Sequence, residues 1–153
     1  MGSLKLTSSA FEDGGEIPRE CGYKNGNEEP PLTISGTPEG TKSLALVMDD
    51  PDAMGAVGKV WVHWIVWNMD PTIAEIGENL RDILSVAVEG ITDFGEMGYG
   101  GPAPPDKRHT YVFKLYALDS ELDLPDKSTK ADVEKAMEGH IIEQATLTGT
   151  YAP

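Results

Sequence analysis

Cysteine is almost absent from this 153-residue chain, and no long hydrophobic run occurs in it. The single Cys21 has no second thiol with which to form an internal disulfide. The most apolar stretch, Val60–Met69, is roughly half the length of a membrane-spanning helix and contains His63 and Asn68. The N-terminal segment lacks the basic and apolar regions of a signal peptide. These absences predict a protein of the reducing cytoplasm that does not insert stably into a membrane.

Basic residues are scarce. The chain has 12 Lys and Arg against 26 Asp and Glu, which gives a formal net charge of −14. Such a field repels nucleic-acid backbones and anionic membrane surfaces, so nucleic acid is a poor candidate partner. An anionic ligand would need donors gathered at one place, such as histidines and backbone N–H groups.

The remaining composition is that of an ordinary globular protein. Hydrophobic residues make up 39% and charged residues 25% of a chain whose length suits one domain. We find no internal repeat and no break in composition. We therefore expect a single domain over residues 1–153.

Short runs typical of β-strands dominate the chain. The turn sequence Gly36–Gly40 predicts a hairpin between the second and third of these runs, and Pro51 should end the third. The predicted strands are Leu4–Ala10, Leu32–Ser35, Ser43–Met48, Val60–Asn68, Leu84–Val88, His109–Leu118 and Glu143–Tyr151.

One helix is predicted near the C-terminus, over about Thr129–Glu138. Ser128 is the expected N-cap residue, and Asp132 lies near the positive end of the helix. Val133 and Met137 follow at helical spacing. The sequence therefore predicts a mainly-β protein with one substantial helix.

Two strands carry histidines. Val60–Met69 is apolar on both alternating faces, which is typical of a central strand covered on both sides. In the run that begins at His109, strict alternation places His109, Tyr111 and Phe113 on one face. That face has polar groups at one end only.

The acidic run from Asp49 to Asp52 could bind a hard cation. Counted as a calcium loop from Asp50, however, it has Met54 and Trp61 at positions that need oxygen ligands. The pattern favours a rigid turn with one or two carboxylates directed inward. The histidines also lack zinc-ligand spacing, and we find no nucleophile motif of a hydrolase.

The glycine-rich segment Gly98–Gly101 is followed by Pro102, so no helix can begin there to bind a nucleotide phosphate. We interpret the segment as a turn whose backbone can approach a small ligand closely.

Three separated segments resemble the phosphatidylethanolamine-binding protein family, in its bacterial and archaeal branch. They are SLALVMDDPDA, VHWIVWNM and GYGGPAPPDKRHTYVFKLYALD, in that order, with matching flanks over nearly the whole chain. The resemblance implies a large central antiparallel β-sheet packed on a smaller sheet, with a C-terminal helix at the side. It also implies a shallow pocket at one end of the central sheet.

Carried over residue by residue, the resemblance implies a ligand-binding set without catalytic residues, metal or cofactor. These residues are Asp50, Asp52, His63, Gly101, Pro102, His109 and Tyr111. Two positions depart from the family's pattern. Met54 replaces a proline, which affects the expected rigidity of the turn, and Thr110 replaces an arginine that alternation would direct away from the pocket.

The residues and the resemblance agree on a module that binds a small anion, such as phosphate, a phosphoethanolamine-like head group or a carboxylate. Protonated histidines would hold the anion better, so we expect affinity to rise as pH falls. Two alternatives remain open. One is an inhibitor of a protease or kinase that acts through surface segments such as Pro51–Lys59 and Asp119–Lys127. The other is a metal-assisted hydrolase that uses Asp50, Asp52, His63 and His109.

Overall fold

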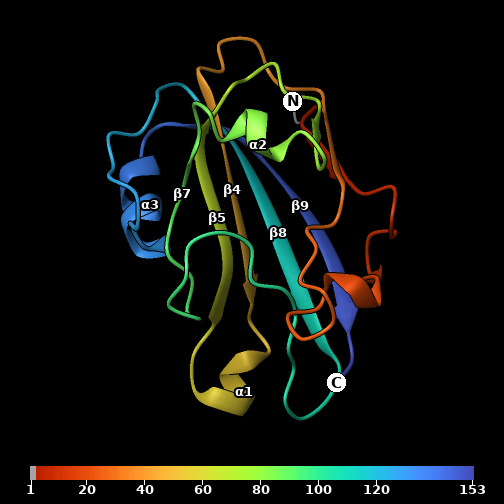
Figure 1. The fold of residues 1–153 in the computed structure, drawn as a ribbon. Helices are drawn as coiled ribbons and strands as arrows, with labels where there is room; N and C mark the ends of the chain where they lie inside the picture. Colours follow the sequence, from red (N-terminus) through yellow and green to blue (C-terminus); the bar gives the residue numbers. More distant parts are fainter. Residues whose placement is uncertain (1–2) are drawn as a thin grey trace.

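The computed structural model describes residues 3–153, and most of its regular structure is β-sheet (Figure 1). A six-stranded sheet has the order β2-β9-β8-β4-β5-β7, and a three-stranded sheet has the order β1-β3-β6. The large sheet comprises β2 (Gly15–Glu16), β4 (Ser43–Asp50), β5 (Trp61–Met69), β7 (Val88–Glu89), β8 (His109–Leu118) and β9 (Ile141–Tyr151). The small sheet comprises β1 (Lys5–Thr7), β3 (Leu32–Ser35) and β6 (Glu75–Ile76).

Helices are short. They are a 3-10 turn at Arg19–Cys21, α1 (Ala53–Val57), α2 (Leu80–Ile83) and α3 (Lys130–Met137). Within residues 3–153, no helix has the length and apolar character needed to cross a membrane.

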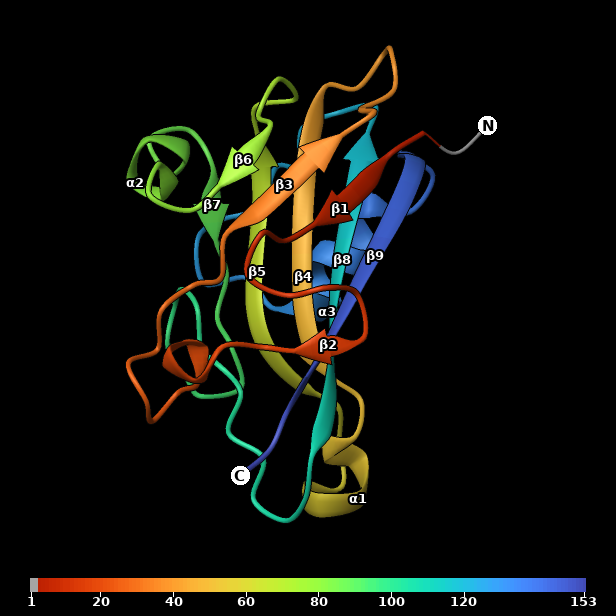
Figure 2. The ribbon, with the colours of Figure 1, turned by 90° about the vertical axis from the view of Figure 1, so that its right-hand side faces the viewer.

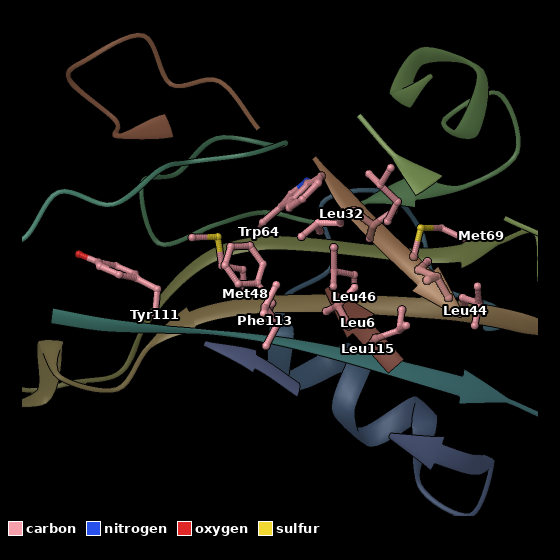
Figure 3. Packing of buried hydrophobic residues seen from close by; sticks show 14 of the residues in the cluster. Leu6, Leu32, Leu44, Leu46, Met48, Trp64, Met69, Tyr111, Phe113 and Leu115 are labelled. Atoms are coloured by element: carbon pink, nitrogen blue, oxygen red, sulfur yellow. The ribbon is translucent and has the colours of Figure 1, made fainter. Parts of the chain in front are cut away.

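The large sheet is buried on both faces. Figure 2 shows the small sheet in front of it and α3 behind it. Because side chains alternate along a strand, Leu46 and Met48 of β4 face the small sheet, whereas Ala45 and Val47 face α3. The first of these two cores includes Trp64, Phe113 and other residues drawn in Figure 3. The predicted mainly-β architecture of two sheets and a C-terminal helix is confirmed.

Strand β5 carries two β-bulges against β4. Asp49 pairs with Val62 and Met48 pairs with Trp64, so His63 has no counterpart on β4. A second shift lies between Leu44 and Leu46, and there Asn68 adopts a left-handed φ of 58°. The first bulge places the side chains of His63 and Trp64 on the same side of the sheet.

Several predicted details are wrong. The run Leu32–Ser35 forms no hairpin with Ser43–Asp50, because β3 pairs with β1 and β6 in the small sheet. The predicted strand Leu84–Val88 is mostly a turn that follows α2, and only Val88 belongs to a strand. The run Leu4–Ala10 contains only the short strand β1.

The N-cap prediction for α3 is also wrong by one residue. Thr129, not Ser128, caps the helix, and Thr129 and Asp132 form a capping box. The Ser128 hydroxyl instead donates to the Pro125 carbonyl at 2.6 Å. In the large sheet, which was expected to be antiparallel, the short β2 pairs in parallel with β9.

Candidate functional site

A cavity of about 220 Å³ lies at the end of the large sheet where α1 connects β4 to β5. In Figure 1 this is the lower end of the molecule. Four segments contribute its walls: the last residue of β4 with α1, the start of β5, the loops before β8, and the first residue of β8. The lining residues are Asp50, Ala53, Ala56, Val57, Trp61, His63, Phe94, Ala103, Pro105 and His109.

The fully buried ring of His109 lies between two carboxylates. Its Nδ1 is 2.6 Å from Asp50 Oδ2, and its Nε2 is 2.7 Å from Asp106 Oδ1. Asp50 is held in place because its Oδ1 accepts the Ala53 N–H at 3.2 Å. Pro51 ends β4 directly after Asp50, so this carboxylate lies at the end of the strand.

Both ring nitrogens of His109 are therefore positioned to donate. Burial alone would lower the pKa of His109, but the hydrogen bonds with Asp50 and Asp106 outweigh it and raise that pKa above its ordinary value. The same bond with His109 lowers the pKa of Asp106. We conclude that Asp50, His109 and Asp106 form a chain of carboxylate, imidazolium and carboxylate.

His63 is brought into the cavity by the β-bulge of β5. Its Nδ1 donates to the Gly100 carbonyl at 2.6 Å, and the Gly100 N–H donates to the His63 carbonyl at 2.8 Å. This two-way contact fixes the ring and its tautomer. Among residues 3–153, Nε2 of His63 has no hydrogen-bond partner.

The environment of His63 favours the neutral ring. Burial lowers the pKa of His63, and this effect exceeds the opposing influence of the Gly100 carbonyl and of Asp50. With the proton on Nδ1, Nε2 carries a lone pair and acts as an acceptor. The two site histidines thus differ: His109 is held charged and His63 is held neutral.

Tyr111 lies on the same face of β8 as His109, and it is also a neighbour of His63 of β5. Its ring packs edge-on against His63, with 5.1 Å between ring centroids. Its hydroxyl is buried and makes no hydrogen bond of good geometry among the described residues, although the Ala103 backbone and the Asp50 carboxylate are near enough to influence its pKa. Figure 3 shows this hydroxyl directed away from the hydrophobic core. Burial, followed by the charge of Asp50, raises the pKa of Tyr111, so the hydroxyl is protonated and can donate.

The structure thus brings together Asp50, His63, His109 and Tyr111, which the sequence predicted as one site. Asp50, His63 and His109 line the cavity, whereas the other predicted residues lie outside its lining: Asp52, Gly101, Pro102 and Tyr111. Asp52 accepts the Thr110 N–H at 2.8 Å and so ties the β4 turn to β8. The binding roles predicted for all seven residues stay predictions.

Gly101 and Pro102 contact the N-terminal half of the chain instead. The Gly101 N–H donates to Asn27 Oδ1 at 2.7 Å, and the Pro102 carbonyl accepts the Tyr23 N–H at 2.9 Å. A Cβ at Gly101 would lie 2.0 Å from the Cys21 carbonyl oxygen, so only glycine fits there. Gly101 therefore makes room for the neighbouring backbone of Cys21.

Sequence reasoning missed Asp106 and the apolar walls. Asp106 lies three residues before His109, a spacing that could have suggested a contact. Trp61 was visible as the start of a strand, but Phe94 comes from a loop without any periodic pattern. The ring of Phe94 packs edge-on against Trp61 and His63, with centroid distances of 5.7 and 5.4 Å.

The residues at this site can exchange protons and hydrogen bonds. No Ser, Thr, Cys or Lys side chain lines the cavity. In the part of the chain that the structure describes, no three or more His, Cys, Asp and Glu side chains are grouped so that they could share a metal ion. The geometry therefore gives no positive support to the metal-assisted hydrolase expected as one alternative.

Comparison with known proteins gives a consistent result. The family model described as phosphatidylethanolamine-binding protein matches residues 7–152. A UPF0098 protein of Methanothermobacter thermautotrophicus is 44% identical over 151 residues, which cover 97% of this chain and 98% of the relative.

Two solved structures share the whole fold. A putative phosphatidylethanolamine-binding protein homologue from Chlamydia trachomatis is 40% identical with a TM-score of 0.90, over 99% of this chain and 98% of that one. The protein YbcL of E. coli is 34% identical with a TM-score of 0.88, over 98% of both chains.

Proposed function

The chain belongs to the phosphatidylethanolamine-binding protein family, and from that premise we propose that its cavity binds small oxyanions of the phosphate monoester type, as found in phospholipid head groups. The observation that carries the proposal is the pair of histidines that line the cavity, together with the buried Tyr111 hydroxyl beside them, a donor without a well-placed partner among the described residues. A buried polar group left unpaired costs about 1–3 kcal/mol, which an acceptor on a ligand would offset.

His63 supplies the second contact. Its neutral ring offers a lone pair at Nε2, which can accept the O–H of a singly protonated phosphate monoester. The second pKa of such esters is about 6, so in mildly acidic solution the added proton can be held either by the ligand or by the imidazole. Whichever of the two groups holds it, one proton lies between the phosphate oxygen and Nε2 of His63.

This geometry changes the expected pH mechanism. His109 is charged, but its two nitrogens already contact Asp50 and Asp106, so its protonation supplies no free donor. The pH dependence therefore rests on the shared proton at His63, which lies near Asp50, Asp49, Tyr111 and the Gly100 carbonyl. A phosphate monoester should take up a proton when it binds above about pH 6.

The remaining walls are apolar and suit the carbon atoms next to a phosphate. The cavity lining includes the apolar residues Trp61, Phe94, Val57 and Pro105. Because the local carboxylates oppose an anion, we expect weak binding near ~1 mM, which corresponds to about −4 kcal/mol.

Calorimetric titration of methyl phosphate and of phosphoethanolamine tests the proposal. In buffers of different ionisation enthalpy, the parent should bind both ligands with proton uptake at pH 7. His63→Gln should weaken binding by about tenfold, as expected for the loss of one good hydrogen bond to a charged ligand. Thr110→Ala is the matched control, since alternation places Thr110 on the other face of β8. Equal affinity of a folded His63→Gln and the parent would refute the assignment.

A second candidate is inhibition of a protease or kinase through Pro51–Lys59. It is favoured by α1, where Met54 and Val57 are 54% and 52% exposed. A carboxypeptidase Y inhibitor solved with its cognate proteinase is 18% identical with a TM-score of 0.55, a likeness that extends to the fold alone. Assays with a carboxypeptidase and a serine protease would test this candidate. It requires inhibition by the parent that Met54→Glu abolishes.

We also propose a cytoplasmic location, because the single Cys21 is buried and unpaired. Burial, with smaller contributions from Glu20 and nearby acids, raises the pKa of its thiol to about 12, so the thiol is unreactive. Fractionation of cells with an antibody to the protein tests this location, and recovery from the medium would contradict it.

A further inference from the structure

The two carboxylates that contact His109 differ in how firmly they are held. Asp50 ends β4, its side chain is 4% exposed, and it also accepts the Ala53 N–H. Asp106 lies in the loop before β8, and its side chain is 45% exposed. Among the described residues, its one other hydrogen bond is from the backbone N–H of the adjacent Lys107, at 2.9 Å. Asp50 is therefore part of the scaffold, whereas the carboxylate of Asp106 can turn toward solvent and leave Nε2 of His109 open to another acceptor.

The charge at the cavity depends on this outer carboxylate. Asp50 and Asp106 together carry two negative charges, and the imidazolium of His109 carries one positive charge. His63 is neutral, and the other lining residues have no charge. With Asp106 in contact the group is anionic, and with Asp106 turned away it is neutral with one charged N–H uncovered.

We propose that Asp106 is a specificity-determining residue of this cavity, whose carboxylate occupies the outer nitrogen of His109 and is displaced when an oxyanion binds there. The proposal rests on the proposed function and assigns a competitor to the same site. A ligand oxyanion would take the position at Nε2 that Asp106 Oδ1 now holds at 2.7 Å. The ligand would then contact His109 as well as His63 and Tyr111.

Displacement also explains which oxyanions would be preferred. The released Asp106 carboxylate remains at the mouth of the cavity, since its backbone lies between Pro105 and His109. A ligand with an ammonium group near its phosphate can pair with that carboxylate, whereas a plain phosphate monoester is repelled by it. The parent should therefore favour phosphoethanolamine over methyl phosphate, and removal of Asp106 should abolish that preference.

Titration of methyl phosphate into the parent, Asp106→Ala and Asp82→Ala tests the competition. Asp82 is an exposed acid of α2, so Asp82→Ala reports the general effect of one lost negative charge. We expect about tenfold tighter binding by Asp106→Ala, because the ligand no longer has to displace a charge-assisted hydrogen bond. Asp82→Ala should stay within about twofold of the parent, because its charge is far from the site and screened.

The outcomes separate this inference from the proposed function. Binding by the parent that Asp106→Ala fails to strengthen beyond Asp82→Ala would overturn the role of Asp106 and leave the proposed function intact. Binding that becomes measurable only in Asp106→Ala would support both. Failure of every variant to bind either ligand would overturn both.

A spectroscopic measurement excludes a merely structural role. The side-chain nitrogens of His109 can be followed by NMR during titration with methyl phosphate. The Nε2 resonance should shift at lower ligand concentration in Asp106→Ala than in the parent, while Nδ1, held by Asp50, changes little. An Nε2 resonance that ignores ligand at saturation, in a variant that binds, would show that the oxyanion binds elsewhere.

Discussion

Asp49 and Asp50 are neighbours in β4, yet their carboxylates lie in different layers of the molecule. Asp49 points toward α3, where its Oδ2 accepts Lys114 Nζ at 3.2 Å and Lys130 Nζ at 2.7 Å. Asp50 points to the other face and contacts His109 and the Ala53 N–H. Both are almost fully buried. The same residue type, one position apart, thus joins elements together on one face and lines a cavity on the other.

The difference lies in the partners. Lys114 and Lys130 are flexible cations that reach in from the surface and close the α3 face. His109 is a rigid ring within β8, and it leaves room beside it. Each region has one buried polar atom without a partner among the described residues, Trp67 Nε1 near α3 and the Tyr111 hydroxyl near the cavity. Tyr111 packs against His63 of the cavity lining, whereas Trp67 packs within the core under α3.

The largest effect on stability is expected when the ion pairs on the α3 face of the large sheet are removed. Asp49→Ala should lower the free energy of unfolding by about 3 kcal/mol, since it leaves two lysines beside a buried gap. Urea denaturation measures this loss, with Asp82→Ala as the surface control. Methyl phosphate affinity of the folded variant should remain within about twofold of the parent. A stability within about 0.5 kcal/mol of the parent would mean that Asp49 is not structural.

The next effect concerns the cavity end and depends on pH. The raised pKa of His109 means that its contacts stabilise the fold fully below the unfolded value of about 6.5. That contribution is lost as pH rises through the higher native value. At pH 6 the parent should exceed His109→Gln by about 2 kcal/mol, as for hydrogen bonds to charged groups. Urea denaturation from pH 6 to 9 should show the gap shrinking; a constant gap would contradict the charged state.

Two tyrosines provide a matched pair for a smaller effect. The hydroxyl of Tyr151 donates to the Arg19 carbonyl at 2.8 Å and accepts from Asn25 Nδ2 at 2.7 Å. Tyr151→Phe should therefore cost about 1 kcal/mol of stability, whereas Tyr111→Phe should cost nothing or stabilise slightly. Methyl phosphate affinity should fall only in Tyr111→Phe. The assignment fails if both variants lose the same stability.

The smallest expected effect is a change in how the free energy of unfolding depends on pH. Because the pKa of His63 is lowered, the unfolded chain binds a proton before the native one does. His63 should therefore reduce stability as pH falls below about 6.5, with a slope of at most about 1.4 kcal/mol per pH unit. Comparing the parent with His63→Gln between pH 7 and 5 isolates this slope. A slope of opposite sign would show that His63 is held charged.

Periodicity predicted the strands that are long and buried. The bounds of β8 and β3 match the prediction, and α3 lies within one residue of it at each end. Local patterns could not decide between partners, however. The turn at Gly36–Gly40 is compatible with a hairpin, but the apolar face of Leu32–Ser35 is better buried across the core than in the large sheet. Leu84–Val88 looked like a strand because four of its five residues are apolar, although the segment follows α2 as a turn.

For the site, alternation in β8 placed His109 and Tyr111 together, and Pro51 located Asp50 at a strand end. The convergence with His63 was available only through the family resemblance, because strict alternation in β5 does not foresee a bulge. Asp106 and Phe94 were missed because loop residues follow no period. Gly101 and Pro102 were identified as special positions, but the sequence does not say whether a glycine makes room for a ligand or for backbone.

Because of the bulge at His63, the cavity depends on the number of residues in β5 as well as on their types. If Val62 were deleted, regular pairing with β4 could resume, with His63 in the place of this buried core residue. Alternation would then carry an imidazole at this point to the α3 face, beside Asp49. A chain could keep every residue type of the cavity and still lack it, so insertions and deletions in β5 are the changes that decide whether a relative retains this site.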